Sequence, residues 1–215
     1  MIFSFFVSIF QLMQPRDLWL RQNDVRTVRS ILSIINGLKL SVSLLGEEDH
    51  LRNKRLYADW QRMQLLNKSS DLIDIEVYGD PPERYILTYS CKGLIWLPGN
   101  PAPSISHQHR FESYLNVDYP RLPPVFRCLT SIFHPNILPP ERNGGVCIGN
   151  WTPAETLDNL CIRLGEMIQY RNYSLTDALD LKAAKWASTH QDSFPLDTRD
   201  FWNHGKEINN EIIIS

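Results

Sequence analysis

The sequence predicts an α+β fold that begins with a helix, continues with a four-stranded antiparallel meander and ends with further helices. Three observations carry this prediction. Apolar residues recur at helical spacing up to about residue 69, alternate with polar residues between residues 72 and 130, and return to helical spacing after residue 151. Apolar side chains make up 43% of the 215 residues, so the chain can bury a core of ordinary size.

The N-terminal part should hold two helices with a short strand between them. Apolar residues follow the helical period from Leu18 to Ile35, and Asn36-Gly37 should end this first helix. Residues 39–46 alternate like a strand. In the second helix, one face would carry four large apolar side chains, namely Leu56, Trp60, Met63 and Leu66.

Four short segments with a period of two follow the second helix, and turn residues separate them. These segments are residues 72–78, 84–96, 109–117 and 124–130. Short consecutive strands of this kind favour an antiparallel meander. Residues 152–155 (TPAE) form a capping box with proline at the first helical position, so a helix should begin there. A last helix is expected around residues 181–188.

Charge and cysteine spacing argue against several kinds of site. The net charge of −2 gives no basic excess for binding nucleic acid. The four cysteines form no Cys-x-x-Cys pair and no zinc spacing with histidine, so we expect no metal, no cofactor and free thiols in a cytoplasmic chain. The apolar run in residues 1–14 is too short for a spanning helix and lacks the basic start of a signal peptide, so no stable membrane insertion is expected.

One cysteine, Cys147, lies in an irregular segment that runs from His134 to Pro153. A cysteine there is either a small apolar residue that packs or a nucleophile whose sulfur a tight turn exposes. Gly144 and Gly145 permit backbone angles and a close approach that other residues forbid. The loop context therefore favours a reachable, reactive sulfur over a buried, inert one.

Several motifs follow one another in a fixed order around this cysteine. They are Tyr119-Pro120, Pro123-Pro124, His134-Pro135-Asn136, Cys147, Trp151 and Pro153. In this order they resemble the ubiquitin-conjugating enzyme family over about residues 51 to 190. The resemblance implies a UBC-like fold and a transferase that carries a ubiquitin-like modifier as a thioester on Cys147. It also implies partners: the modifier, an activating enzyme, a target amine, and a ligase or deconjugating protease of the same system.

The resemblance assigns roles to further residues. Asn136 would stabilise an oxyanion or hold the active-site loop, and both roles stay open. Asp177, in the segment SLTDAL, would position and deprotonate the incoming lysine, unless it only caps the last helix. Supporting positions around these residues would be His134, Pro135, Gly144, Gly145, Trp151 and Pro153.

The chain departs from the common eukaryotic pattern of this family in three respects. Ten residues separate Asn136 from Cys147, which is more than usual, and three separate Cys147 from Trp151, which is fewer. The third departure is the N-terminal extension. These features resemble the bacterial conjugating enzymes of ubiquitin-like operons, so a bacterial origin and a role in antiphage defence are the corresponding expectations.

We accordingly divide the chain into an extension of residues 1–48, a UBC-like conjugating domain of residues 49–195 and a tail of residues 196–215. The activating enzyme is expected to dock on the basic side chains of Arg52, Arg55 and Arg62. The extension would either help to select that enzyme or serve as a stabilising flap.

Two other functions stay open: a catalytically silent binding module with this fold, and a cysteine hydrolase, which needs a histidine within reach of its nucleophile.

Overall fold

The computed structural model describes residues 25–202 and divides into two compact units, Met1–His50 and Leu51–Ser215. Helix α3 (Val25–Ser69) begins in the first unit and ends in the second. Residues 1–14, the apolar start of the expected extension, lie outside the described residues. No helix between residues 25 and 202 is both long enough and apolar enough to cross a membrane.

Helix α3 is continuous where the sequence predicts a break. The expected stop at Asn36-Gly37 and the expected strand at residues 39–46 are both wrong, because all of these residues are helical. A glycine inside a helix costs only about 1 kcal/mol relative to alanine, so it does not by itself end the element. A lone strand would leave its backbone groups unpaired, whereas a helix pairs them within itself.

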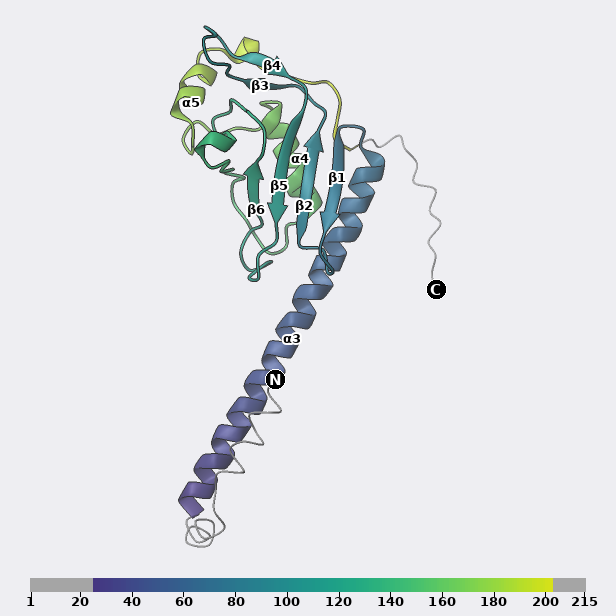
Figure 1. Ribbon diagram of the computed structural model, residues 1–215, viewed down its shortest axis with the longest axis vertical. Coiled ribbons are helices and arrows are strands. Elements are labelled where there is room, and N and C mark those ends of the chain that lie inside the picture. The colour runs from purple at the N-terminus through teal and green to yellow at the C-terminus, as the bar shows by residue number, and fades with distance from the viewer. Residues whose placement is uncertain (1–24, 203–215) are drawn as a thin grey trace. The chain divides into compact units, whose positions relative to one another are not determined.

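The predicted four-stranded antiparallel meander is confirmed. It consists of β1 (Ile73–Tyr78), β2 (Arg84–Tyr89), β5 (His109–Tyr114) and β6 (Val125–Cys128), in that order across the sheet. Figure 1 shows these strands side by side, with helix α4 (Leu157–Ile168) behind them. The register places one buried residue of each strand in a single row, namely Ile75, Leu87, Phe111 and Cys128. This row forms part of the core.

Between β2 and β5 the chain leaves the sheet. The second predicted strand, residues 84–96, is divided into β2 and β3 (Gly93–Ile95), and β3 pairs with β4 (Ser104–Ser106) in a separate two-stranded sheet. At the start of β3, a Cβ on residue 93 would lie 2.5 Å from Nε2 of the buried His109. Glycine therefore lets the backbone pass close to the first sheet before it turns away.

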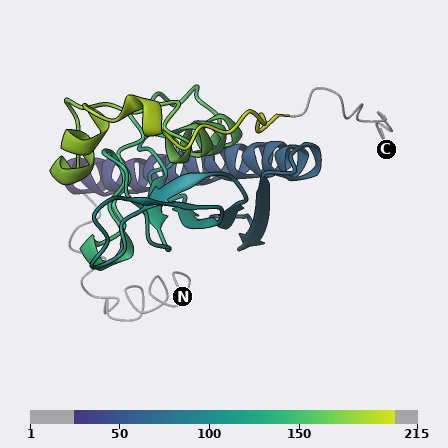
Figure 2. The same cartoon turned by 90° about the horizontal axis from the view of Figure 1, so that it is seen from above.

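Helices cover one face of the four-stranded sheet, as the view from above shows (Figure 2). Leu160 and Leu164 of α4 are fully buried, and so are Met63 and Leu66 from the last turns of α3. A smaller, largely aromatic cluster lies around Tyr170 and packs against helix α5 (Leu181–Ala187). Two short 3-10 helices complete the described elements, η1 (Pro140–Arg142) and η2 (Gln191–Ser193).

Helix α4 begins later than the predicted capping box. The structure starts it at Leu157, and the backbone N–H of Leu157 donates to Oδ1 of Asp59, on α3, at 3.3 Å. The side chain of Glu155, which the capping box needs, pairs with Arg163 instead. The carbonyls of Pro153 and Glu155 both accept from the guanidinium of Arg55. A contact from another helix thus replaces the local cap.

The segment after α5 packs against the domain. Phe201 is only 3% exposed, and its ring lies edge-on to Tyr89 at 5.8 Å between ring centroids. A Cβ on Gly165 of α4 would collide with this ring. The predicted tail of residues 196–215 therefore begins too early, and residues 203–215 lie outside the described part of the chain.

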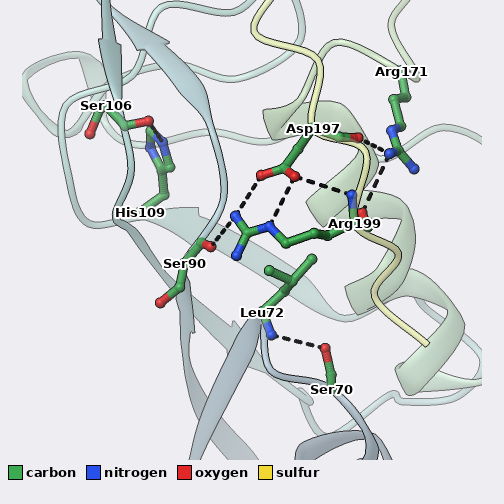
Figure 3. A network of polar contacts seen from close by, with 8 residues as sticks. All are labelled: Ser70, Leu72, Ser90, Ser106, His109, Arg171, Asp197 and Arg199. Carbon is green, nitrogen blue, oxygen red and sulfur yellow. Dashed lines mark hydrogen bonds and ion pairs between the residues drawn. The ribbon is translucent and has the colours of Figure 1, made fainter. Parts of the chain in front are cut away.

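A polar network fastens the same segment (Figure 3). The guanidinium of Arg199 donates to both carboxylate oxygens of Asp197, at 3.0 and 2.6 Å, and to the carbonyl of Ser90 at 3.2 Å. These hydrogen bonds hold the pKa of Asp197 well below its usual value. Arg171, just after α4, donates to the backbone carbonyl of Asp197. The segment is therefore bound to Ser90, just after β2, and to Arg171, just after α4.

Candidate active site

The segment from Asn136 to Cys147 is a hairpin. The N–H of Cys147 donates to the carbonyl of Asn136 at 2.9 Å, and the N–H of Leu138 donates to the carbonyl of Gly145 at 2.8 Å. The 3-10 helix η1 lies in the turn at its far end. The ten residues between Asn136 and Cys147 therefore do not form an open loop, and backbone pairing holds Cys147 opposite Asn136.

Gly144 is the position in this hairpin that requires glycine. Its φ is +68°, and a Cβ there would lie 2.5 Å from the carbonyl oxygen of Cys128. The carbonyl of Gly144 accepts from the N–H of Cys128 at 2.8 Å, which joins the hairpin to β6. Gly145 is less constrained: its N–H donates to the side-chain oxygen of Asn143 at 2.9 Å.

Cys147 differs from the other cysteines in its exposure. All four thiols are free, but Cys147 alone is partly exposed, whereas Cys91, Cys128 and Cys161 are buried. Burial raises the pKa of the Cys91 thiol to about 12 and that of Cys128 to about 11, so both stay protonated at neutral pH. Cys147 is therefore the thiol that a partner can reach.

The three residues predicted to be catalytic line one cavity with a volume of about 100 Å³. Cys147 and Asn136 come from the hairpin, and Asp177 comes from the loop before α5. Sequence reasoning missed the other residues of the lining, which are Ile148, Gly149, Met167, Asn172, Tyr173 and Ser174. Three of these directly precede the LTD segment, so their position in the chain was an available signal.

The side chain of Asn136 uses both halves of its amide. Nδ2 donates to the carbonyls of Ser174 and Asp177, at 2.9 and 3.0 Å, and Oδ1 accepts from the N–H of Ser174 at 2.8 Å. An Nδ2 group has two hydrogens, and both are donated here. In this arrangement the side chain of Asn136 holds the loop that carries Asp177, whereas the supporting role expected for it concerned the loop that carries Cys147.

His134 and Pro135 lie behind the hairpin. His134 is fully buried, and its Nδ1 accepts from the N–H of Asn136 at 3.1 Å. Burial lowers the pKa of His134 to about 3, so the ring is neutral at pH 7. The carbonyl of Pro135 accepts from the N–H of Leu179 at 2.8 Å and from that of Asp180 at 2.9 Å. Both residues thus occupy structural positions.

Asp177 is exposed, and its carboxylate accepts from the hydroxyl of Ser174 at 3.1 Å. Capping of α5 falls to Asp180 instead, because its Oδ1 accepts from the N–H of Ala183 at 3.0 Å. The alternative in which Asp177 serves only as the helix cap is therefore wrong. Its carboxylate stands at the cavity with free acceptor capacity.

Trp151 and Pro153 follow the cysteine and pack against the domain. The indole N–H of Trp151 donates to the carbonyl of Pro120 at 3.0 Å, and the indole lies 5.7 Å from the Tyr119 ring between centroids. The carbonyl of Pro153 accepts from Arg55 at 2.5 Å. The short segment between Cys147 and α4 is therefore anchored at two points.

The three arginines expected to dock a partner differ in their surroundings. Arg52 pairs with Glu83 at 2.8 Å and Arg55 pairs with the buried Asp59 at 2.7 Å, so both guanidinium groups are engaged within the domain. Arg62 is exposed. Of the three, Arg62 is the one whose charge is presented to solvent.

A family profile matches the part of the chain that forms this site. The profile described as ubiquitin-conjugating enzyme matches residues 98–201, which include the hairpin, every residue of the cavity, and α4. Over this range the chain is similar to ubiquitin-conjugating enzymes. The matched range also contains Phe201, so the similarity extends over the segment after α5.

Two curated relatives are named as NEDD8-conjugating enzymes. The NEDD8-conjugating enzyme UBC12 of Yarrowia lipolytica is 31% identical over 91 residues, which are 40% of this chain and 48% of that protein. The NEDD8-conjugating enzyme ubc-12 of Caenorhabditis elegans is 27% identical over 181 residues, 78% of this chain and 93% of that protein. The chain thus spans about half of the first relative and nearly all of the second. Both relatives are eukaryotic, and the bacterial origin expected for this chain stays a prediction.

A solved structure, the putative ubiquitin-conjugating enzyme of Trypanosoma cruzi, is 19% identical and covers 66% of this chain and 93% of its own. Its TM-score is 0.48. A structural similarity of this size carries no argument, and the similarity to conjugating enzymes is drawn from the sequence profile and the curated relatives.

Proposed function

We propose that this chain is a conjugating enzyme that accepts a ubiquitin-like modifier as a thioester on Cys147 and transfers it to a target amine. One observation carries the proposal: the partly exposed Cys147 lines the same cavity as Asn136 and Asp177. A thioester carrier needs a sulfur that two large partners can reach in turn. The similarity to ubiquitin-conjugating enzymes supports the same reaction type.

Loading exchanges one thioester for another. The thiolate is the nucleophilic form of cysteine, and it attacks the carbonyl carbon at the modifier's C-terminus, where the modifier is bound to the activating enzyme as a thioester. A bond forms to the Cys147 sulfur, and the thiolate of the activating enzyme leaves. The acyl group arrives activated, so the step requires no cofactor from this chain.

Discharge transfers the acyl group to nitrogen. The acceptor amine attacks the thioester carbonyl, an amide bond forms, the Cys147 thiolate leaves, and the nitrogen gives up a proton. The exposed carboxylate of Asp177 is the group that we assign to receiving the ammonium form of the lysine and helping it to lose that proton. Asn136 contributes by holding the Asp177 loop beside the cysteine.

The names of the relatives support a choice of partners. Both are named as NEDD8-conjugating enzymes, so a modifier of that ubiquitin-like class, with its activating enzyme, is the first candidate. A ligase and a deconjugating protease of the same system, and a cytoplasmic setting, complete the proposal. If the chain is bacterial, the modifier of its own operon is the second candidate, and antiphage defence becomes its context.

Two other functions receive less support. A silent binding module would not need a partly exposed cysteine in a cavity. A cysteine hydrolase needs a histidine beside its nucleophile, and within the described residues no histidine lines the cavity. His134 and His109 are buried, and His190 is stacked on Trp186 at 4.9 Å between ring centroids.

The test is a loading assay with ATP, an activating enzyme and its modifier, run for NEDD8 and for ubiquitin. We expect the wild-type chain to form an adduct that a reducing agent removes. Cys147→Ser should form an adduct that resists the reducing agent, because an oxyester replaces the thioester. Cys147→Ala should form none. Gel electrophoresis with and without reducing agent distinguishes these outcomes.

The matched control is Cys91→Ala, which removes a buried thiol and should leave loading intact. A reducible adduct on the Cys147→Ala chain would contradict the proposal, since it would place the acyl group on another thiol. Absence of any adduct with every modifier tested would favour the binding module.

A further inference from the structure

The loop that carries Asp177 is held at both ends by one hairpin. We call residues 174–180 the acceptor loop. The amide of Asn136 makes two hydrogen bonds with the backbone of Ser174, at the start of the loop, and one with the carbonyl of Asp177, at 2.8 to 3.0 Å. At the end of the loop, the carbonyl of Pro135 accepts from the N–H of Leu179 at 2.8 Å and from that of the next residue at 2.9 Å. The backbone is therefore held at Asp177 itself and on both sides of it.

Arg142 adds a side-chain anchor at the second end. Its Nη1 lies 2.6 Å from Oδ2 of Asp180, and its Nη2 donates to the carbonyl of Leu179 at 3.4 Å. The Asp180 side chain is 11% exposed, whereas that of Arg142 is 52% exposed. The other oxygen of Asp180 caps α5 through Ala183. One carboxylate therefore joins the hairpin, the acceptor loop and the last helix.

The position of Arg142 in the chain places this contact at the turn of the hairpin. Arg142 belongs to η1, at the turn of the hairpin whose other end carries Cys147. The same hairpin therefore carries Cys147 at one end and the contact to Asp180 at its turn.

We propose that Arg142 is a positioning residue for the acceptor step: it fixes the acceptor loop, and with it Asp177, relative to Cys147. The proposal rests on the proposed function and deepens it, because it assigns the turn of the hairpin to the acceptor step and not to loading. Loading takes place at the Cys147 sulfur, and the contacts of the ion pair are with Leu179 and Ala183, not with Cys147. Discharge also needs the amine to be aimed at the thioester carbonyl.

The test separates discharge from loading. Arg142→Gln removes the charge, and Asp180→Asn breaks the ion pair while keeping a side chain that caps helices equally well. We expect each variant to load at the wild-type rate and to discharge to lysine about 3- to 10-fold more slowly, since misplacing a reacting group by 1 Å can cost up to about 100-fold. The loss should appear as a higher KM for lysine. The double variant should be no slower than the slower single variant, because the two residues act through one contact.

Two further variants serve as controls. Arg142→Lys keeps the positive charge and should recover part of the discharge rate. Arg121→Gln removes a similar exposed ion pair, that with Asp118 at 2.6 Å, and should change neither step. Hydrogen exchange of the Leu179 and Asp180 amides in the unloaded protein reports on the anchor without any turnover, and it should be faster in Arg142→Gln than in wild type.

Three outcomes would overturn the proposal. If Arg142→Gln discharges at the wild-type rate, Arg142 does not position the acceptor loop. If loading and discharge slow equally, the substitution affects the hairpin as a whole. Multiplicative losses in the double variant show that the two residues act separately. Failure of the wild-type chain to load at all overturns the proposed function, and is distinguishable because hydrogen exchange still shows whether Arg142 anchors the loop.

Discussion

At the scale of single residues, Asn136 connects the two parts of the candidate site. Its backbone carbonyl pairs with Cys147, and its side-chain amide holds the loop that carries Asp177. The residue itself is 3% exposed, and every hydrogen of its Nδ2 is donated to a backbone carbonyl. An oxyanion would have to compete with these bonds, so the structure favours loop support.

Asn136→Ala tests this preference. Loss of the amide leaves part-buried backbone groups of Ser174 and Asp177 unpaired, which costs about 1 kcal/mol, so we expect a lower unfolding free energy together with slower discharge. Urea denaturation and single-turnover discharge to lysine are the two measurements. A variant with wild-type stability whose discharge falls by about 100- to 1,000-fold would instead identify an oxyanion donor.

At the scale of elements, α3 and α4 are joined through one carboxylate. Asp59 is 1% exposed and accepts from Arg55 at 2.7 Å, from the Tyr119 hydroxyl at 2.5 Å and from the N–H of Leu157 at 3.3 Å. It thus caps a helix that lies 98 residues further along the chain. The segment between Cys147 and α4 depends on the same network, because Arg55 also holds its carbonyls.

Asp59→Ala should therefore destabilise the domain. Removing one partner of a buried ion pair costs about 3–5 kcal/mol, and the low end applies here because the Arg55 side chain is 20% exposed. Asp59→Asn should cost less, since it keeps an acceptor for Leu157. Urea denaturation measures both variants. Gln61→Ala, at an exposed position of the same helix, is the control and should change the unfolding free energy by less than about 0.5 kcal/mol. A similarly small change for Asp59→Ala would contradict the role of the network.

At the scale of the whole described domain, the segment after α5 contributes Phe201 to the hydrophobic core. Phe201 packs where α4 has a glycine, and the contacts of Arg199 with Asp197 and Ser90 fasten the segment from outside. Small and large residues at facing positions interdigitate in this way in well-packed cores. The domain thus extends beyond the last helix, as far as residue 202 in the part that the structure describes.

Phe201→Ala should lower the unfolding free energy by about 3–5 kcal/mol, because it removes a buried ring and leaves a cavity. Differential scanning calorimetry should show the corresponding fall in Tm. Leu196→Ala is the matched control, since Leu196 lies in the same segment but is 55% exposed and should have little effect. Equal effects of the two substitutions would mean that the segment does not contribute to the core.

The sequence by itself determined the fold class and the principal residues of the candidate site. Alternation and helical spacing are local patterns, so the four strands of the larger sheet, the α4 stripe and the last helix could be predicted from neighbouring residues alone. Cys147, Asn136 and Asp177 could be chosen because their motifs follow one another in a recognisable order. The lining of one cavity by all three agrees with that choice.

Only the tertiary structure decided where elements start and what holds the site together. The start of α4 depends on Asp59, the continuity of α3 overrides a local stop signal, and the core includes Phe201 from the predicted tail. The anchor between Arg142 and Asp180 joins residues 38 positions apart. Such contacts leave no trace in local periodicity, because their energies arise from groups that only the folded chain brings within hydrogen-bonding distance.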